Sequence, residues 1–322
     1  MGNSVVEELN KISFATFVFH LRATTELNLP RYKGSTLRGA FGTVFKDTVC
    51  VMDHRDCGRC ILRLKCVYPY VFDTPVPDDS TRMRKYQTAP HPFVIEPPLD
   101  TRTIYDPGSS LAFDLILVGK AIGYLPYFIY TFERLGGRNG IGKSRGKFEV
   151  EKVSWVDALG NEGTIYNGEE KILANTFRPL TIRDLGILKG SKNLVVRYIT
   201  PTRITYDGNL LESPKFHVVI SSLLRRLANL AYFHSQVELE LDFRGIIDRA
   251  KEIEMLNGSV KWYDWERYSA RQDTKIKMGG FTGNVEYEGD LLEFLPFLKL
   301  GEVIHIGKGT VFGLGKYRIG RE

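Results

Sequence analysis

Four cysteines lie within the first quarter of the chain, with the spacing Cys50-x6-Cys57-x2-Cys60-x5-Cys66. Thiolates two residues apart can converge on one metal ion, and four thiolates complete a closed tetrahedral site. Zinc and an iron–sulfur cluster use the same ligands, and a reducing cytoplasm favours either of them over the alternative, a disulfide. We therefore expect a structural metal or cluster that pins an insertion at residues 50–66 and leaves no ligand position open for chemistry.

Glycines gather in two basic segments. Of the 31 glycines, five lie between Gly136 and Gly146, and nine lie between Gly279 and Gly315. Successive N–H groups of a glycine-rich turn can converge on an anion, to which lysine and arginine add attraction. The run GIGKS at 140–144 is not a nucleotide P-loop, because it leads into an expected strand rather than a helix. Polynucleotide phosphate is the better ligand, and a tight turn with solvated basic residues is the alternative. The candidate binding residues are Arg138, Lys143, Arg145, Gly307, Lys308, Gly309, Gly313, Gly315 and Lys316.

Aromatic residues are interleaved with arginines in the run WYDWERY at 262–268, which contains Arg267 and is followed by Arg271. Stacking of bases on aromatic rings, together with guanidinium contacts, is a common way to hold single-stranded RNA. Alternating aromatics of a strand more often pack into a core, and we favour that role for these rings. Arg267 and Arg271 are candidate RNA contacts.

The composition bounds the class of protein. The chain has 322 residues, 43% of them hydrophobic and 12% aromatic, with a net charge of +6, so it is not globally disordered. Its most apolar stretch, 111–130, is interrupted by Asp114, Lys120 and Pro126, which argues against a membrane-spanning helix. The N-terminus shows no secretory pattern, so we expect a cytoplasmic protein with no membrane partner.

The same order of sequence features, an expected strand followed by a helix, a glycine loop and a second strand, occurs twice, about 165 residues apart. The segments LPYF at 125–128 and LPFL at 295–298 both lead through glycine to an IGK tripeptide, at 141–143 and 306–308. An expected strand precedes each one, at 111–118 and 275–288. Chance recurrence of glycine loops is the alternative, but the shared order of features favours duplication.

The earlier part of each unit adds a strand and a helix. A strand at 13–24 precedes a helix from about Thr36, and a strand at 193–206 precedes a long helix opened by Ser213 and Pro214. That helix places Arg225, Arg226 and Asn229 mostly opposite its apolar face. Asp290 and Glu293 have the spacing of a capping box for the last helix.

Each half therefore has the order β-α-β-β-α-β. We predict an α+β protein of two tandem ferredoxin-like (RRM-like, βαββαβ) domains. The first domain, at 1–185, contains the cysteine insertion at 50–66, and the second, at 186–322, contains the glycine-rich loop.

Several motifs together resemble the CRISPR-associated precursor-RNA-processing endoribonucleases of the RAMP superfamily (Cas-six type). They are GSTLRGAFGTVF, the cysteine segment with YPYVFDTPVP, GIGKSRGKF, TPTRI, SSLLRRLANLAYFH, WYDWERYSARQDTKIKMGGFTGNVEYEGDL and HIGKGTVFGLGKY. The resemblance spans nearly the whole chain. It implies two ferredoxin-like domains, a C-terminal glycine-rich loop that grips RNA, and metal-independent cleavage of CRISPR repeat RNA by attack of a ribose 2′-hydroxyl on the adjacent phosphate, which leaves a 2′,3′-cyclic phosphate.

That chemistry needs a general base and a general acid, and histidine suits both roles. Many members of the family place a histidine within or just after the first helix, but residues 36–49 contain none. We expect His305, beside the glycine-rich loop, to act in catalysis, followed by His54, with Tyr32 and Lys33 as supporting candidates. A catalytically inactive RNA-binding subunit of a CRISPR effector complex is the alternative, as is an interaction module whose glycine loops are only turns. Other effector subunits are expected partners beside the repeat RNA.

Overall fold

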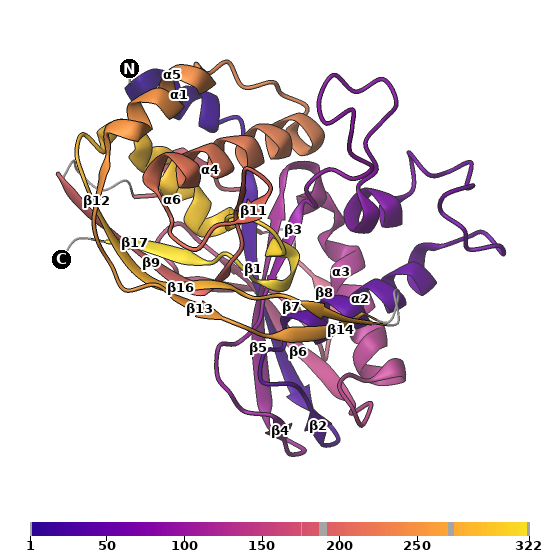
Figure 1. Cartoon of the computed structure of the whole chain (residues 1–322). Coiled ribbons are helices and arrows are strands. Elements are labelled where there is room, and N and C mark those ends of the chain that lie inside the picture. The colour runs from indigo at the N-terminus through magenta and orange to yellow at the C-terminus, as the bar shows by residue number, and fades with distance from the viewer. Residues whose placement is uncertain (1, 175, 187–191, 270–273, 321–322) are drawn as a thin grey trace. The chain divides into compact units, whose positions relative to one another are not determined.

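The computed structural model describes residues 2–174, 176–186, 192–269 and 274–320. The chain divides into two compact units, each with helices and antiparallel sheets (Figure 1). The N-terminal unit comprises residues 13–180 and 233–235. The C-terminal unit comprises residues 1–12, 181–232 and 236–322. The prediction of a mixed α+β protein is confirmed.

Six antiparallel strands form the main sheet of the N-terminal unit, in the order β3-β5-β1-β6-β7-β8. They are β1 (Phe14–Ala23), β3 (Phe93–Glu96), β5 (Ser110–Val118), β6 (Phe148–Val156), β7 (Glu162–Asn167) and β8 (Ile172–Leu173). Helix α2 (Gly34–Val49) follows β1, and α3 (Leu125–Arg134) follows β5. The shorter elements are β2 (Leu27–Asn28), which pairs with β4 (Ile104–Tyr105), and the single turns η1 (Pro69–Asp73), η2 (Gly119–Tyr124) and η3 (Leu135–Asn139).

Phenylalanines join the two helices to the sheet of this unit. The ring of Phe41 in α2 stacks on Phe128 of α3, with centroids 4.7 Å apart, and lies 6.1 Å from Phe93 of β3. Phe19 of β1 stacks on Phe113 of β5 at 5.0 Å, and all these rings are almost wholly buried. Burial of this aromatic area stabilises the unit by roughly 25 cal/mol per Å² of apolar surface removed from water.

The main sheet of the C-terminal unit has the order β12-β16-β9-β17, and β13 also pairs with β16. Its strands are β9 (Asn193–Thr202), β12 (Glu254–Gly258), β13 (Lys261–Tyr263), β16 (Gly280–Glu288) and β17 (Tyr317–Gly320). Two further ladders join β10 (Thr205–Tyr206) to β11 (Asn209–Leu210) and β14 (Glu266–Ser269) to β15 (Thr274–Lys277). The helices are α1 (Gly2–Leu9), α4 (Phe216–Leu230), α5 (Phe243–Arg249) and α6 (Leu295–Ile304). The short turns are η4 (Ile182–Asp184), η6 (Ala250–Glu252), η7 (Leu292–Phe294) and η8 (Thr310–Phe312). The turn η5 (Ala231–Ser235) is divided, since its last three residues belong to the N-terminal unit.

Helix α1 belongs to the C-terminal unit although it lies at the start of the chain. It contacts α6, η4 and η7, and its Leu9 is fully buried. The Glu8 carboxylate accepts a hydrogen bond from the backbone N–H of Glu240 at 2.7 Å. The predicted range 1–185 had included these residues in the first domain, because the three apolar positions of so short a helix do not reveal which core they enter.

Local details of two helices, α4 and the last helix, differ from the sequence-based expectations. Helix α4 begins at Phe216 with Lys215 as N-cap, because the Pro214 carbonyl is held outside the helix by the hydroxyl of Tyr287. Arg226 and Asn229 are buried rather than exposed. Glu293 does not complete a capping box, because its carboxylate accepts two hydrogen bonds from Arg249, at 2.6 and 2.7 Å.

Among the residues that the structure describes, no helix has the length and apolar character needed to cross a membrane.

Candidate functional site

The C-terminal glycine-rich loop, residues 305–316, folds back on the end of β9. The Thr200 hydroxyl donates to the Gly313 carbonyl at 2.8 Å, and the Lys308 N–H donates to the Arg203 carbonyl at 2.8 Å. Gly307 and Gly315 have φ angles of +80° and +74°, and a Cβ on either would overlap a backbone carbonyl. The glycines are therefore required for this backbone path, whatever the loop binds.

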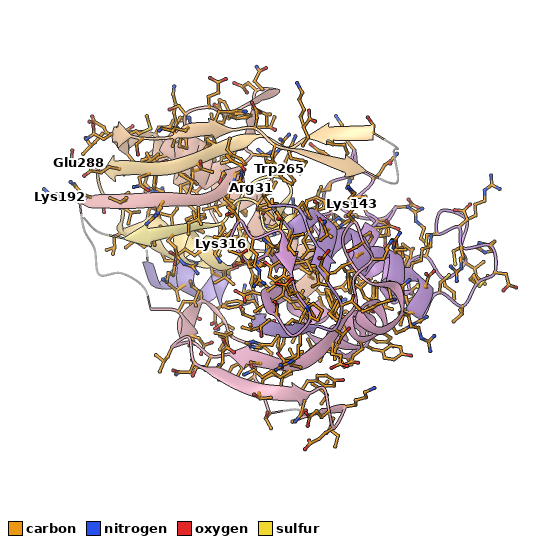
Figure 2. All side chains as sticks on the ribbon, turned by 90° about the horizontal axis from the view of Figure 1, so that it is seen from below. Arg31, Lys143, Lys192, Trp265, Glu288 and Lys316 are labelled. Carbon is orange, nitrogen blue, oxygen red and sulfur yellow. The ribbon has the colours of Figure 1, made fainter. Side chains whose placement is uncertain are left out.

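Two lysines of this loop differ in their surroundings. The side chain of Lys308 is exposed, whereas that of Lys316 is half-buried. The backbone N–H of Lys316 donates to the Thr200 hydroxyl at 2.9 Å. Figure 2 shows Lys316 at the end of the sheet opposite to Lys192 and Glu288, so the loop lies at one end of β9. An exposed cation on a rigid loop is suited to contact a phosphate.

His305 is fully buried at the base of the loop. It ends α6 with φ +62°, and its Nδ1 lies 2.9 Å from the Leu314 carbonyl oxygen. In this arrangement the ring joins the two ends of the loop and has no surface on which a substrate could bind. Its expected catalytic role stays a prediction.

The buried Arg226 supports the same base of the loop. Its guanidinium donates two hydrogen bonds to the Ile304 carbonyl, at 3.0 and 2.8 Å, and burial lowers its pKa to about 10. The positive end of this side chain thus lies at the C-terminus of α6, where the helix dipole favours a cation. The sequence contained a signal for this role, since Arg226 follows Leu223 by three residues and precedes Leu230 by four, which places it on the apolar face.

The first glycine-rich loop, residues 136–147, is a closed turn in the N-terminal unit. Ile141 and Gly146 form an isolated bridge, and the Lys143 N–H donates to the Asn28 carbonyl at 2.9 Å. The side chains of Arg138, Lys143 and Arg145 are exposed, and Lys143 is labelled in Figure 2. The turn therefore has a structural reason for its glycines and still presents three cations to solvent.

Tyr32 and Lys33 lie just before α2. Lys33 is fully buried, and its ammonium group donates to the backbone carbonyl of Asp100 at 2.9 Å and to Oδ1 at 3.2 Å. Burial alone would raise the pKa of Asp100, but the hydrogen bond and charge of Lys33 lower it below its usual value. Burial also raises the pKa of Tyr32, which keeps its phenol protonated. The ammonium group of Lys33 is therefore engaged by Asp100, and the phenol of Tyr32 is held in its protonated form by burial.

His54 lies far from these two residues. It is exposed in the cysteine segment, and its Nδ1 accepts the Asp56 N–H at 3.0 Å. Lys33 is the N-cap of α2, whereas His54 follows the C-terminus of that helix, and the 16 residues between its ends span about 24 Å. The structure therefore does not bring His54 together with Tyr32 and Lys33.

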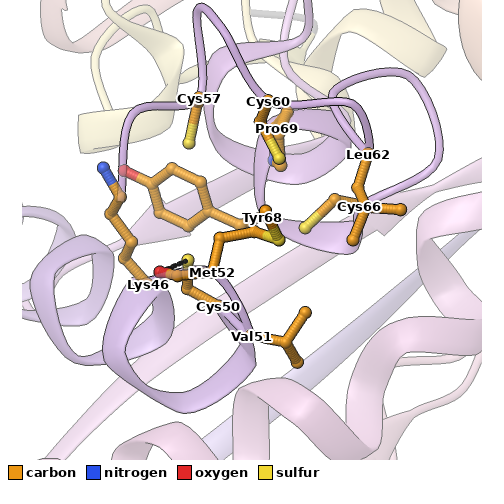
Figure 3. A pocket seen from close by; sticks show the side chains of 10 residues that line it. All are labelled: Lys46, Cys50, Val51, Met52, Cys57, Cys60, Leu62, Cys66, Tyr68 and Pro69. Carbon is orange, nitrogen blue, oxygen red and sulfur yellow. Dashed lines mark hydrogen bonds between the residues drawn. The ribbon is translucent and has the colours of Figure 1, made fainter. Parts of the chain in front are cut away.

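The four cysteines line one pocket, together with Lys46, Met52 and Tyr68 (Figure 3). All four are half-buried free thiols, and Cys50 Sγ lies 3.6 Å from the Met52 carbonyl oxygen. Within the described ranges, no three or more His, Cys, Asp or Glu side chains converge into a ready-made metal site. The four cysteines of the predicted insertion thus line the same pocket, but their sulfur atoms are not arranged as the ligands of one metal ion.

The aromatic run at 262–268 contributes exposed rings, so their expected core role was wrong at two positions. Trp262 and Tyr263 of β13 are 41% and 49% exposed, because this short segment lies at the edge of the sheet. Trp262 Nε1 donates to Asp264 at 2.7 Å. Arg271 lies outside the described residues, and only the backbone of Arg267 is described, in β14.

Comparisons with known proteins place these features in a family. Residues 12–177 match a family model described as an N-terminal domain (AF_1859_N), and residues 196–317 match the model of the CRISPR-associated endoribonuclease Cas6. No curated protein matches the chain significantly.

Solved structures share the fold over almost the full length. A Cas6 of Thermus thermophilus is 13% identical, with a TM-score of 0.53, and the match covers 96% of this chain and 99% of that one. A Cas6 product complex is 14% identical, with a TM-score of 0.55 and coverage of 96% and 99%. A partial Cas6-RT-Cas1–Cas2 complex is 13% identical, with a TM-score of 0.56, and the match covers 97% of this chain and 46% of that one. Residues 196–317 are thus similar to the Cas6 family of CRISPR-associated endoribonucleases, and the chain shares the fold of solved Cas6 structures over almost its full length.

Proposed function

We propose that this protein cuts precursor CRISPR RNA within its repeats to give guide RNAs, in the cytoplasm. The observation that carries the proposal is the glycine-rich loop at the end of β9, in which a rigid backbone presents the exposed Lys308. The match of residues 196–317 to the Cas6 endoribonuclease model supports repeat RNA as the substrate. Other CRISPR-associated subunits are proposed partners, by analogy with the Cas6-RT-Cas1–Cas2 complex.

Each unit, in this proposal, is a ferredoxin-like domain. The strand orders β3-β5-β1-β6 and β12-β16-β9-β17, with helices after the first and third strands in chain order, support it. The sequence-based boundary lies between residues 185 and 186, whereas the two compact units divide after residue 180, and we assign α1 to the second domain.

The proposed reaction is a transesterification. The ribose 2′-hydroxyl loses its proton to a general base and attacks the adjacent phosphorus, while the bond to the 5′-oxygen of the next nucleotide breaks. A general acid protonates that oxygen, and a 2′,3′-cyclic phosphate remains. Catalysis takes no metal ion in this proposal, and a structural zinc ion or iron–sulfur cluster on the four cysteines would serve the fold alone.

His305, His54, Tyr32 and Lys33 are the proposed sources of the acid and the base. A comparison of His305→Ala with the wild type separates two roles for this buried ring. If His305 enters the reaction, the single-turnover cleavage rate falls far more than RNA affinity. If it only positions the glycine-rich loop, cleavage and affinity fall together.

The test of the function is incubation of the protein with repeat RNA from its own CRISPR array in excess EDTA. Cleavage within the repeat that leaves a 2′,3′-cyclic phosphate supports the proposal. Tight binding without cleavage supports the second candidate, an inactive RNA-binding subunit of an effector complex. That candidate is favoured by two observations: α2 contains no histidine, and His305 is buried. If the protein neither binds nor cleaves the RNA, both candidate functions are contradicted.

We expect Lys308→Ala to weaken RNA binding about tenfold and to flatten its salt dependence. Loss of one phosphate contact with a single strand reduces the slope of log K against log[salt] by about 0.7. The measurement is RNA affinity at several salt concentrations. Lys192→Ala is the matched control, because Lys192 is exposed at the opposite end of β9 (Figure 2). Equal effects of the two substitutions would contradict a specific role for the loop.

A further inference from the structure

The segment between α2 and η1, residues 50–66, is here called the cysteine loop. All of it is described, and it consists of turns and bends without a helix or strand. Its apolar side chains are largely outside any core, since Val51, Ile61 and Leu64 are 78%, 87% and 63% exposed. Ordering a loop of this length costs conformational entropy that so little apolar burial does not offset. Another interaction must therefore hold it.

The four cysteine side chains of the loop line the same pocket. Figure 3 shows their sulfur atoms around one pocket. Cys50 caps the C-terminus of α2, where its N–H donates to the Lys46 carbonyl at 2.9 Å, and the Cys66 carbonyl accepts the Tyr70 N–H at 3.2 Å. Cys57 and Cys60 lie between them in the loop. A ligand shared by all four would tie the middle of the loop to both flanking elements.

Two of these ligands are already held in place by packing. The Tyr68 ring beside Cys66 lies 5.8 Å from Phe45 of α2, and Phe72 of η1 packs so closely on Gly42 that a Cβ there would overlap its ring. Cys50 and Cys66 are thus fixed by the contact between η1 and α2. Cys57 and Cys60 belong to a segment without regular structure, whose path would have to change for them to join the other two in one ligand set.

We infer that the cysteine loop binds one zinc ion through the thiolates of Cys50, Cys57, Cys60 and Cys66. Four thiolates complete the tetrahedral coordination of zinc, and each thiol releases its proton when the ion binds. A single redox-inert ion suits this pocket better than an iron–sulfur cluster, because its cavity of about 20 Å³ has room for little more than one water-sized particle. The inference specifies the structural metal of the proposed function and does not depend on RNA cleavage.

The test measures metal content and loop order in the full-length protein. We expect about one zinc per chain by mass spectrometry, and thiolate-to-metal charge-transfer absorption when cobalt replaces zinc. The loop contains the exposed trypsin sites Arg55, Arg59, Arg63 and Lys65. Removal of the metal by a chelator should accelerate trypsin cleavage at these sites about tenfold or more, because cleavage follows the population of the open loop.

Cys57→Ser should reproduce the effect of the chelator, whereas Ile61→Ser, an exposed neighbour in the same loop, should retain zinc and resist trypsin as the wild type does. If Cys57→Ser does not fold, chelation of the wild-type protein gives the same comparison. Iron with acid-labile sulfide in place of zinc would overturn the inference, as would a metal-free protein whose loop resists trypsin equally with and without added zinc. Both readouts are independent of RNA, so a failure here leaves the proposed nuclease activity intact.

Discussion

Gly315→Ala should lower the free energy of unfolding by roughly 1–3 kcal/mol and reduce RNA affinity about tenfold or more. Gly315 has φ +74°, and an added Cβ would overlap the Ile306 carbonyl oxygen. The backbone would have to move, and with it the hydrogen bond of 3.0 Å from the Ile306 N–H to the Gly315 carbonyl. The loop that carries Lys308 would then lose its shape. Denaturant unfolding and RNA-binding titrations measure the two effects.

Gly320→Ala is the control for this substitution. Gly320 lies in the strand that follows the loop, without a positive φ, and a Cβ there meets open space. We expect its stability and RNA affinity to stay close to those of the wild type. Two glycine variants with the same stability and affinity would show that the tight path of the loop has no role in either property.

Arg226→Leu should destabilise the protein by about 2–4 kcal/mol. The substitution removes two hydrogen bonds to the Ile304 carbonyl, which would be left buried at the end of α6 without a donor. Leucine fills much of the same apolar space, so the loss reports chiefly on the hydrogen bonds. Because Ile304 precedes His305 directly, we also expect weaker RNA binding through a less ordered loop.

The matched control is Arg225→Leu, at the exposed neighbouring position of α4. Its free energy of unfolding should stay within about 0.5 kcal/mol of the wild type, as is usual for surface substitutions. Chemical denaturation of the three proteins side by side gives the comparison. An Arg226→Leu protein as stable as Arg225→Leu would contradict the supporting role of Arg226.

Sequence periodicity predicted the main strands well where one face is buried. The expected strands at 13–24 and 111–118 correspond to β1 and β5, whose apolar residues fill one core. The expected strand at 275–288 is instead divided into β15 and β16 at Met278 and Gly279. An alternation of apolar and polar residues does not show where one strand ends and the next begins, because the alternation continues through both strands. Here β15 pairs with β14, whereas β16 pairs with β9.

The candidate site was less predictable, because burial and long-range contacts decide what its residues can do. The cysteine spacing predicted a metal or cluster site, and the four thiols line one pocket without forming a ligand set among the described residues. In contrast, the contact of Lys33 with Asp100 joins residues 67 positions apart and has no local sequence signal. His305 was chosen for its position beside the glycine-rich loop, and the same position buries its ring against the Leu314 carbonyl.

The membership of α1 in the C-terminal unit bears on how the chain is completed during synthesis. Residues 13–180 can collapse as soon as they leave the ribosome, since domains generally fold in order from the N-terminus. Helix α1 must wait, because its contacts with α6 and η7 need residues near 300. Its isolated eight residues are too few for a stable helix in water. Helix α1 is thus made before residues 13–180 but becomes ordered after them, together with the unit whose core it joins.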